Sequence, residues 1–415
     1  MSLARDRVRV LYSFPHKLGA DRICYTAWQQ VNCLAKAGAD MLVFPGVLHR
    51  PVAASVKVCP TLAWKKLRVS YKLLGKMRAL ALHDHIVARR IEKLVGQVDV
   101  IHAWPVAALE TLKTGARLGI PTVLERPNAH TRFAFETVKK EFDRLGVDLP
   151  PEDEYYYRGD VLKKEEAEYE MADYILCPSD FVARTFVDQG VARSKLLRHK
   201  FGFDEKVFYP SGEPENLRRG LRMLFVGVCA VRKGLHFALE AWLKSPASRS
   251  GTFLIAGEFL TAYQNRLSPM LAHPSVKLLG HRTDIPELMR KSDLLVLPSI
   301  EEGFPLVIAE AIGSGCIPLA SDVCAEICRH MENGLVHPVG DVETLAQQIT
   351  MLHSDRNLLG RLRAGCLETA SEFTWTSAGV RLLQVYRDAI GLYRQRQCHK
   401  DVMAKSFSRP LKSWL

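Results

Sequence analysis

The sequence has no long apolar run. No stretch of about 18 consecutive apolar residues occurs among its 415 residues, so we expect no membrane-spanning helix. The first residues, MSLARDRVRVLYS, also lack the apolar core of a signal peptide and lead directly into a strand-like segment. These absences predict a protein that stays in the cytoplasm.

The ten cysteines show no metal-binding pattern. There is no CxxC, and although Cys324 and Cys328 lie four apart with Cys316 nearby, no further ligands accompany them. Nor does an Asp-x-Asp stand at the end of a strand-like run. We therefore expect free thiols in a reducing compartment, no metal and no other cofactor.

Acidic residues are scarce in the first hundred positions. Of the net charge of +12, residues 1–100 contribute +11, from 17 Lys and Arg against 6 Asp and Glu. Such a local excess predicts an anionic partner, which could be a membrane surface, a lipid-linked acceptor or nucleic acid. Nucleic acid is disfavoured because no recognised binding module is present and aromatic residues do not interleave the basic run.

Residues 64–80, WKKLRVSYKLLGKMRAL, hold six basic residues and no acid. At helical spacing one face would carry Lys65, Arg68, Lys72 and Lys76. A second face would carry Trp64, Leu67, Tyr71, Leu74 and Met77. Two interpretations stay open: a helix that lies in the interface of an anionic membrane, or a core-packing helix with a solvated basic face.

Strand-like runs alternate with helical stretches in two successive series. The first series comprises Val8–Ser13, Met41–Phe44, Val98–Ala103, Pro121–Leu124 and Tyr174–Pro178. The second comprises Arg222–Gly227, Thr252–Ala256, Val276–Leu279 and Leu294–Pro298. Continuous apolar runs are typical of parallel strands covered on both faces. The predicted fold class is therefore α/β, with two doubly wound, Rossmann-like domains facing across a cleft.

A stretch rich in Pro, Gly and charge separates the two series, which predicts a linker at 206–220. The expected N-terminal domain is then 1–205, and the expected C-terminal domain is 221–375. We expect a closing helix at 376–395 and a tail at 396–415. The strongly charged residues 139–170 are interpreted as solvated helices with a loop at Pro150–Pro151.

The segment EGFPLVIAE carries two glutamates separated by seven residues. Glu302 lies in the loop after the predicted strand ending at Pro298, and Glu310 lies on a helix that begins near Leu306. Free N–H groups at the start of that helix can receive a phosphate, and Gly303 lets the backbone approach a ligand closely. The alternative is an exposed loop acid and a helix-surface acid.

A second segment, LFVGVCAVRKGLHFALEAW, runs from a strand through a glycine-containing loop into a helix. Arg232, Lys233 and Gly234 open that helix. Two cations at a helix N-terminus form a pocket for a diphosphate, unless they are simply solvated surface residues.

These segments resemble the motifs of family 4 glycosyltransferases, the "glycosyl transferases group 1" type of retaining enzyme with the GT-B fold. The stretches ENGLV at 332–336, PVGD at 338–341 and FTW at 373–375 agree in order. The resemblance covers most of residues 172–395 and only scattered points before them. It implies that the helix at 376–395 packs back onto the N-terminal domain.

The resemblance makes 1–205 the acceptor-side domain and 221–375 the nucleotide-sugar-binding domain, and it assigns roles to the donor site. Glu302 would contact hydroxyls of the donor sugar, Glu310 would hold the nucleotide ribose, and His281 would border the base. The stretch against sugar and phosphate would comprise Gly303, Phe304, Pro305, Leu306 and Val307. Many members have Gly-Arg where this chain has Gly227-Val228, and Arg232 is the candidate replacement for that charge.

In the N-terminal half, LERPNAH follows a predicted strand and resembles the family's cleft segment. It ends in His130, which the resemblance places near the transferred sugar; the alternative is an ordinary loop histidine. Gly19 resembles the glycine that lets this domain approach the donor diphosphate. The expected catalytic residues are Glu302, His130 and Lys233.

The resemblance implies transfer with retention, in which cations and amides stabilise the leaving diphosphate. The expected function is transfer of a sugar from a nucleotide-diphosphate donor to a hydroxyl acceptor in cell-envelope polysaccharide, lipopolysaccharide or glycolipid assembly. The alternatives are a nucleotide-sugar epimerase or phosphorylase of the same fold, or a catalytically inactive sugar-binding protein.

Overall fold

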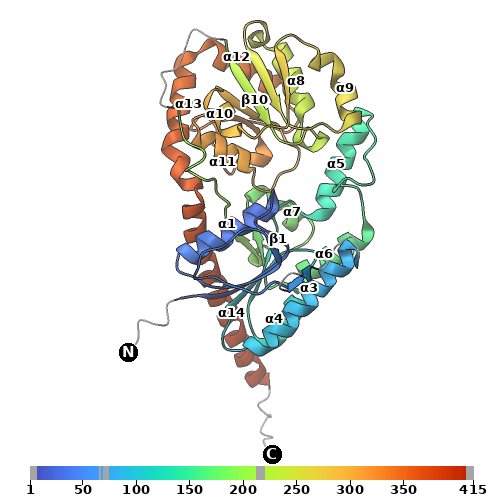
Figure 1. The fold of residues 1–415 in the computed structure, drawn as a ribbon, viewed down its shortest axis with the longest axis vertical. Coiled ribbons are helices and arrows are strands. Elements are labelled where there is room, and N and C mark those ends of the chain that lie inside the picture. Colours follow the sequence, from blue (N-terminus) through green and yellow to red (C-terminus); the bar gives the residue numbers. More distant parts are fainter. Residues whose placement is uncertain (1–6, 65–66, 69–73, 212–219, 408–415) are drawn as a thin grey trace, which may run out of the picture.

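The computed structural model describes residues 7–64, 67–68, 74–211 and 220–407, with the backbone alone at 64, 67–68 and 400–407. Two parallel sheets, each covered by helices, lie one above the other (Figure 1). We call them, with their helices, the first half and the second half. The predicted α/β class with two doubly wound sheets is confirmed.

The first sheet has seven parallel strands in the order β3-β2-β1-β6-β7-β8-β9. Its strands are β1 (Arg9–Leu18), β2 (Asp40–Leu48), β3 (Lys57–Val58), β6 (Val100–Ala103), β7 (Thr122–Glu125), β8 (Tyr174–Cys177) and β9 (Leu196–Arg198). Its helices are α1 (Ile23–Lys36), α3 (Lys76–Ile91), α4 (Leu109–Leu118), α6 (Gly159–Met171) and α7 (Asp180–Asp188). Strands β6, β7 and β8 are buried along their whole length, as expected for a sheet covered on both faces.

The second sheet has six parallel strands in the order β12-β11-β10-β13-β14-β15. Its strands are β10 (Arg222–Val226), β11 (Thr252–Ala256), β12 (Val276–Gly280), β13 (Leu294–Leu297), β14 (Ile317–Ser321) and β15 (Leu335–His337). Its helices are α8 (Leu235–Lys244), α9 (Thr261–Leu271), α10 (Ile285–Arg290), α11 (Leu306–Gly313), α12 (Val342–Ser354) and α13 (Arg356–Thr369). The strand order reverses between β10 and β13, the place where such sheets bind ligands.

The last helix, α14 (Trp375–Phe407), runs from the second half down along the first (Figure 1). It packs against α1, and the Tyr386 hydroxyl lies 2.6 Å from Nδ1 of His102, a residue of the first sheet. The helix extends past 395 into the stretch expected as a tail. Neither Gly nor Pro occurs between Gly391 and Pro410, so nothing in the sequence stops it earlier.

Helix α5 (Thr131–Leu145) and the loop after it, residues 131–158, are named here the α5 segment. The segment follows β7 of the first sheet but spans to the second half (Figure 1). Its buried apolar side chains belong to the core cluster of the second half: Ala134, Val138, Phe142, Val147 and Tyr155. Glu141 lies 2.9 Å from Nε2 of His236 on α8, and the Arg266 side chain donates to the carbonyl of Leu145. The α5 segment therefore follows the first half in sequence but packs against the second half.

The expectation of solvated helices at 139–170 is therefore only partly right. The helices and the intervening loop are present, but Tyr155, Glu165 and Glu168 are buried. The two carboxylates have partners in the first half: Glu165 pairs with Arg126, and Glu168 accepts the N–H groups of Val106 and Ala108. Charge in the sequence did not distinguish these partnered acids from solvated ones.

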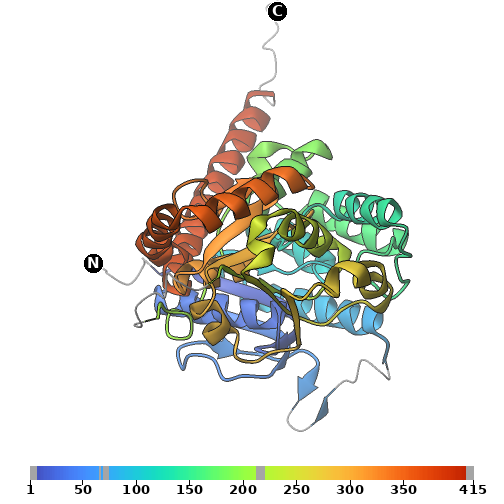
Figure 2. The ribbon, with the colours of Figure 1, turned by 90° about the horizontal axis from the view of Figure 1, so that it is seen from above.

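The prediction of a single helix over 64–80 is wrong. Strand β4 (Ala63–Trp64) pairs antiparallel with β5 (Leu67–Arg68), and this pair stands away from the body of the first half (Figure 2). Helix α3 begins only at Lys76, after Gly75 with a φ of 81°. Lys65, Tyr71 and Lys72 lie outside the described residues. No helix of the described chain combines the length and apolarity needed to cross a membrane.

Candidate donor site

Glu302 lies in the loop after β13 and is 6% exposed. Its Oε1 accepts from the Ser299 hydroxyl (3.0 Å), forms an ion pair with the ammonium of Lys233 and lies 3.4 Å from Nη1 of Arg232. Burial raises the pKa of Glu302, but the charges of Lys233 and Arg232 bring it below its ordinary value. The structure thus joins an ionised Glu302 to both cations expected from the sequence.

A glycine brings these groups together. Lys233 and Arg232 lie on a short 3-10 turn, Val231–Lys233, which Gly234 connects to α8. Gly234 has a φ of 66°, and a Cβ atom there would come within 1.9 Å of the Pro298 carbonyl oxygen. Only glycine allows the turn to pack against the end of β13, where the Glu302 loop begins.

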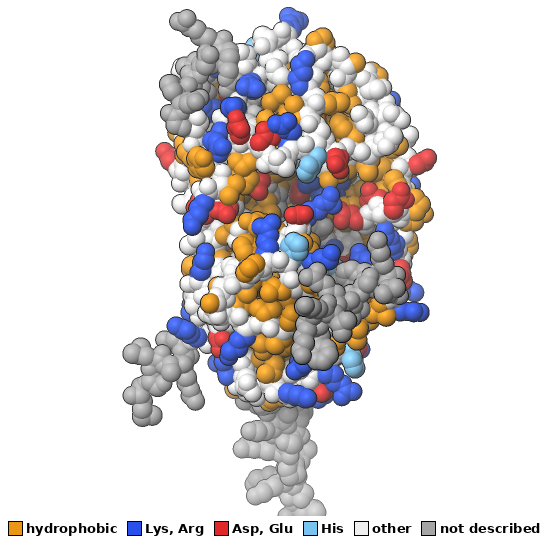
Figure 3. All heavy atoms as spheres, viewed as in Figure 1, with side chains coloured by type: hydrophobic (Ala, Val, Ile, Leu, Met, Phe, Trp, Pro, Cys, Tyr) orange, Lys and Arg blue, Asp and Glu red, His pale blue; other side chains and the backbone are white. Residues whose placement is uncertain are grey.

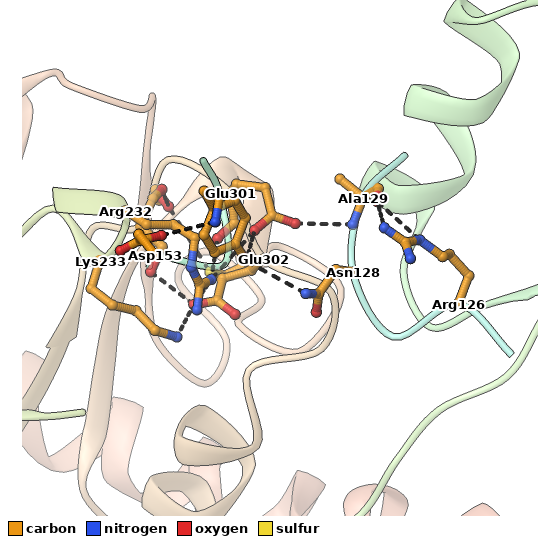
Figure 4. A network of polar contacts seen from close by, with 12 residues as sticks. Arg126, Asn128, Ala129, Asp153, Arg232, Lys233, Glu301 and Glu302 are labelled. Carbon is orange, nitrogen blue, oxygen red and sulfur yellow. Dashed lines mark hydrogen bonds and ion pairs between the residues drawn. The ribbon is translucent and has the colours of Figure 1, made fainter. Parts of the chain in front are cut away.

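Arg232 is held by protein groups. Its Nη1 donates to the Glu301 carbonyl oxygen (2.8 Å), and its guanidinium lies 5.1 Å from the centre of the Tyr155 ring. Burial opposes the charged form, but Tyr155, Glu302 and Glu301 together raise the pKa of Arg232. As placed here, Arg232 supports the loop that carries Glu302 as well as contributing charge beside Lys233 (Figure 4).

Glu301, which sequence reasoning missed, joins the loop of Glu302 to other parts of the chain. Its side chain is fully buried; Oε1 accepts from the Ala129 N–H (2.9 Å) and Oε2 accepts from the Tyr155 hydroxyl (3.0 Å). Figure 4 shows Glu301 between Arg232 on one side and the loop with Ala129 on the other. The only trace in the sequence is a second glutamate beside Glu302, since Tyr155 is 146 residues away.

Gly303 is a point of contact between the halves. A Cβ atom on Gly303 would lie 1.4 Å from the carbonyl oxygen of Pro127, so any larger residue would push the two loops apart. The close approach seen at Gly303 is thus to the first half, and its expected approach to a ligand stays a prediction.

Helix α11 begins at Leu306, directly after Pro305, and no side chain within the described chain caps its N-terminus. The amides of Leu306 and Val307 therefore stand at an uncapped helix start. Phe304 is buried, with its ring 5.7 Å from that of Phe201. Glu310, one turn further, is half-buried, and burial raises its pKa to about 7.

Gly19 and His281 also follow strands. Gly19 has a φ of 88° after β1, and a Cβ atom there would meet Cβ of Arg50 at 2.7 Å. His281 is exposed and follows Gly280 at the end of β12. Both residues thus lie at carboxyl ends of strands, where the two sheets carry their loops.

His130 lies in the first half, at the start of α5. It caps α5, its N–H donates to the Thr185 hydroxyl (3.0 Å), and its ring packs 5.0 Å from the rings of both Tyr169 and Phe186. Burial, with Arg126 and Arg132 nearby, lowers the pKa of His130 to about 4, so the ring is neutral at pH 7. Within the described residues no contact joins His130 to Glu302 or Lys233; its neighbour Ala129 makes the contact with the second half.

Arg126 holds that loop, and sequence reasoning missed this residue too. Its Nη1 pairs with Glu165 (2.8 Å), and its Nη2 donates to the Ala129 carbonyl and to the Thr131 hydroxyl, both at 2.9 Å. The buried pair fixes the turn between β7 and α5, and so the direction of the Ala129 N–H.

The space between the halves is open at the surface. Figure 3 shows charged side chains of both signs around a hollow between them. A cavity of about 500 Å³ is lined by Phe133 and Thr185 of the first half and by Ile300 and Asp322 of the second. Among the described residues there is no cluster of three or more His, Cys, Asp or Glu that could hold a metal ion.

Comparison with known proteins places these features in a family. Residues 220–355 match the model described as "Glycosyl transferases group 1". A D-inositol 3-phosphate glycosyltransferase of Salinispora arenicola is 32% identical over 87% of this chain and 85% of its own length. Other matches are local. An exopolysaccharide phosphotransferase of Streptomyces coelicolor is 36% identical over 31% of this chain, which spans only 14% of that protein.

A further local match, 32% identical over 27% of this chain and 30% of its own length, is an N-acetylgalactosaminyltransferase of Campylobacter jejuni. Its full name is N,N'-diacetylbacillosaminyl-diphospho-undecaprenol alpha-1,3-N-acetylgalactosaminyltransferase.

Solved structures share the fold. Sucrose-phosphate synthase from Thermosynechococcus elongatus superposes with a TM-score of 0.65 at 17% identity, over 93% of this chain and all of the other. HepE of Anabaena in complex with UDP-glucose superposes with a TM-score of 0.60 at 17% identity, over 94% of this chain and all of the other.

Proposed function

The chain belongs to the group 1 glycosyltransferases, family 4, and on that premise we propose that it moves a sugar from a nucleotide diphosphate to a hydroxyl group with retention at the anomeric carbon. The observation that carries this proposal is the contact of Glu302 with Lys233, made where β10 and β13 end side by side. It joins a carboxylate suited to sugar hydroxyls with a cation suited to a diphosphate. Glu310 lies one turn into α11 in the same segment and would hold the nucleotide ribose.

In the proposed reaction the bond from the anomeric carbon to the phosphate oxygen breaks, and a bond to the acceptor oxygen forms on the same face. The departing phosphate oxygen takes the acceptor's proton. Lys233 and the amides of Leu306 and Val307 at the start of α11 stabilise the charge on the leaving diphosphate. Glu302 positions the sugar, and no metal is required because these groups supply the positive field.

Roles for the remaining residues are part of the same proposal. Gly234 and Gly303 allow close packing around the donor. Phe304 and Pro305 connect Gly303 to α11, and His281 borders the base. Gly19 lets the first half approach the diphosphate, with Arg232 beside Lys233. His130, neutral at pH 7, acts through the helix it caps, α5, or on the sugar when the donor is bound.

The acceptor in this proposal is a saccharide or lipid-linked hydroxyl compound of the cell envelope, met on the cytoplasmic face of a membrane. Two observations support it. A related enzyme is named for a substrate linked to diphospho-undecaprenol, and residues 1–100 of this chain carry a net charge of +11. The basic excess suits an anionic lipid surface.

The test is thermal stabilisation of the purified protein by UDP, GDP and ADP and by their sugars, with and without EDTA. One nucleotide should raise the melting temperature of the wild type, and its sugar should be turned over. Lys233→Ala and Glu310→Ala should abolish the shift, whereas EDTA should leave shift and turnover intact. Failure of every nucleotide to stabilise the wild type would remove the proposed donor site, and loss of turnover in EDTA would remove its metal independence.

A further inference from the structure

Three contacts from outside the second sheet converge on the short segment that carries Glu302. The Ala129 N–H and the Tyr155 hydroxyl each donate to one oxygen of Glu301, at 2.9 and 3.0 Å. On the other side of Glu302, Gly303 touches the carbonyl of Pro127. Glu302 therefore lies between two residues that are both held by the chain from the first half.

Glu301 cannot itself be a ligand for the donor. Its carboxylate is fully buried and both of its oxygens are occupied by protein donors. It instead joins its own loop to three other parts of the chain: the Ala129 loop, the α5 segment through Tyr155, and the turn Val231–Lys233 through Arg232. Arg232 donates to the Glu301 carbonyl at 2.8 Å, lies 3.4 Å from its Oε2 and packs over the ring of Tyr155.

We infer that Glu301 and Tyr155 are positioning residues, which make the placement of Glu302 depend on contact between the two halves. This inference rests on the proposed function, because it is Glu302 that would hold the donor sugar. Tyr155, packed in the core of the second half, holds one oxygen of Glu301, and when the halves are in contact the Ala129 N–H holds the other. Glu302 is then directed at the sugar. When the halves separate, Glu301 loses the Ala129 N–H, Gly303 leaves Pro127, and the loop with Glu302 is no longer held. The donor therefore reacts only when the halves are in contact, in the closed molecule, where water is excluded.

Two conservative variants test the inference. Tyr155→Phe removes one hydroxyl, and Glu301→Gln keeps the shape of the side chain while removing its charge. The matched control is Glu326→Gln, which weakens another contact between the same halves, where Glu326 pairs with Arg198 at 2.9 Å. The assay is release of nucleoside diphosphate from the nucleotide sugar whose nucleotide stabilises the wild type, with a saccharide or lipid-linked hydroxyl acceptor present to take the sugar.

We expect kcat to fall by about tenfold or more in both variants while the donor KM stays within about threefold, as for an interaction used mainly in the transition state. The double variant should be no slower than the slower single one, because both act through one contact. Glu326→Gln should keep kcat within about twofold of the wild type. Unchanged kcat in Tyr155→Phe and Glu301→Gln, or an equal loss in Glu326→Gln, would overturn the inference.

A second measurement separates this inference from the proposed function. Hydrogen exchange of the Ala129 amide and of the peptide 299–305 should be about tenfold faster or more in Glu301→Ala than in the wild type, and unchanged in Glu326→Gln. An unprotected Ala129 amide in the wild type would overturn the positioning role. A protein that binds no nucleotide but shows the expected exchange would keep the contact and lose the glycosyltransferase proposal.

Discussion

Glu302 and Glu310 belong to one motif, yet their surroundings move their pKa values in opposite directions. Lys233 and Arg232 keep the pKa of Glu302 below its usual range despite burial, whereas burial alone raises the pKa of Glu310 to about 7. At the scale of residues, the candidate site thus holds one ionised carboxylate, Glu302, and a second, Glu310, that is partly protonated near neutral pH. The second should make donor binding depend on pH.

The expected pH dependence follows from the sign of the Glu310 shift. A carboxylate accepts hydrogen bonds from ribose hydroxyl groups better than a carboxylic acid does, so protonation of Glu310 below pH 7 should weaken donor binding. The Kd of the nucleotide sugar should rise about tenfold from pH 8 to pH 6. In the free protein the raised pKa acts the other way. Its contribution to stability is fully present below about pH 4.5, the ordinary value, and is lost as pH rises through about 7.

Isothermal titration across that pH range measures the effect, with Glu310→Gln as the control. The variant should bind more weakly at pH 8 and show no pH dependence of its own. Parallel curves for the wild type and Glu310→Gln would assign the titration to another group.

At the scale of elements, the site depends on how the turn before α8 packs against the end of β13. Gly234 makes that contact through its positive φ and the 1.9 Å approach of a Cβ position to the Pro298 carbonyl. The contact brings Lys233 from one strand end to Glu302 from the next. The junction of these two elements is therefore both a folding contact and the proposed diphosphate site.

Gly234→Ala should lower the free energy of unfolding by at least about 2 kcal/mol, since it adds a backbone clash to the strain of a left-handed conformation. Gly119→Ala is the matched control. Gly119 has a φ of 70° at the end of α4, but its Cβ position meets nothing within 4 Å, so only the strain of about 1 kcal/mol remains. Urea unfolding compares the two, and equal losses would mean that the β13 contact contributes nothing.

The elements also show where sequence patterns suffice. The strand–loop–helix motifs that carry Lys233, Glu302 and Glu310 are local, so their spacing predicted them. The helix over 64–80 was wrong because periodic basic residues imitate an amphipathic helix, while Gly75 ends that pattern and Trp64 lies in a strand pair. Glu301 and Tyr155 could not be predicted, because their contact joins residues 146 apart and leaves no periodic pattern.

At the scale of the whole molecule, charge is divided between the halves. Residues 1–100 carry a net charge of +11, whereas residues 101–205 carry −4, so the part of the first half built from residues 1–100 is the side that an anionic surface would attract. The prediction of a single helix over 64–80 is wrong, but the basic residues that suggested a membrane contact belong to the sequence of this half.

We therefore expect the protein to float with vesicles containing anionic lipid at low salt, and not with neutral vesicles. Reversing three charges of the basic stretch, Lys65→Glu, Arg68→Glu and Lys72→Glu, should abolish flotation. A variant with the same change in net charge on the second half, Arg249→Glu, Lys277→Glu and Arg361→Glu, should float like the wild type. Equal flotation of both variants would exclude this stretch as the contact.

The α5 segment bears on how such enzymes can be recombined. The chain passes between the halves at the linker, again at α14, and a third time through the α5 segment, whose Phe142 and Tyr155 complete the core of the second half. A chimaera cut only at the linker would pair the donor-side sheet with a foreign α5 segment and leave Glu301 without its own tyrosine. Exchange of donor specificity by domain shuffling thus requires residues 131–158 to be transferred together with the second half, although they lie within the first half in sequence.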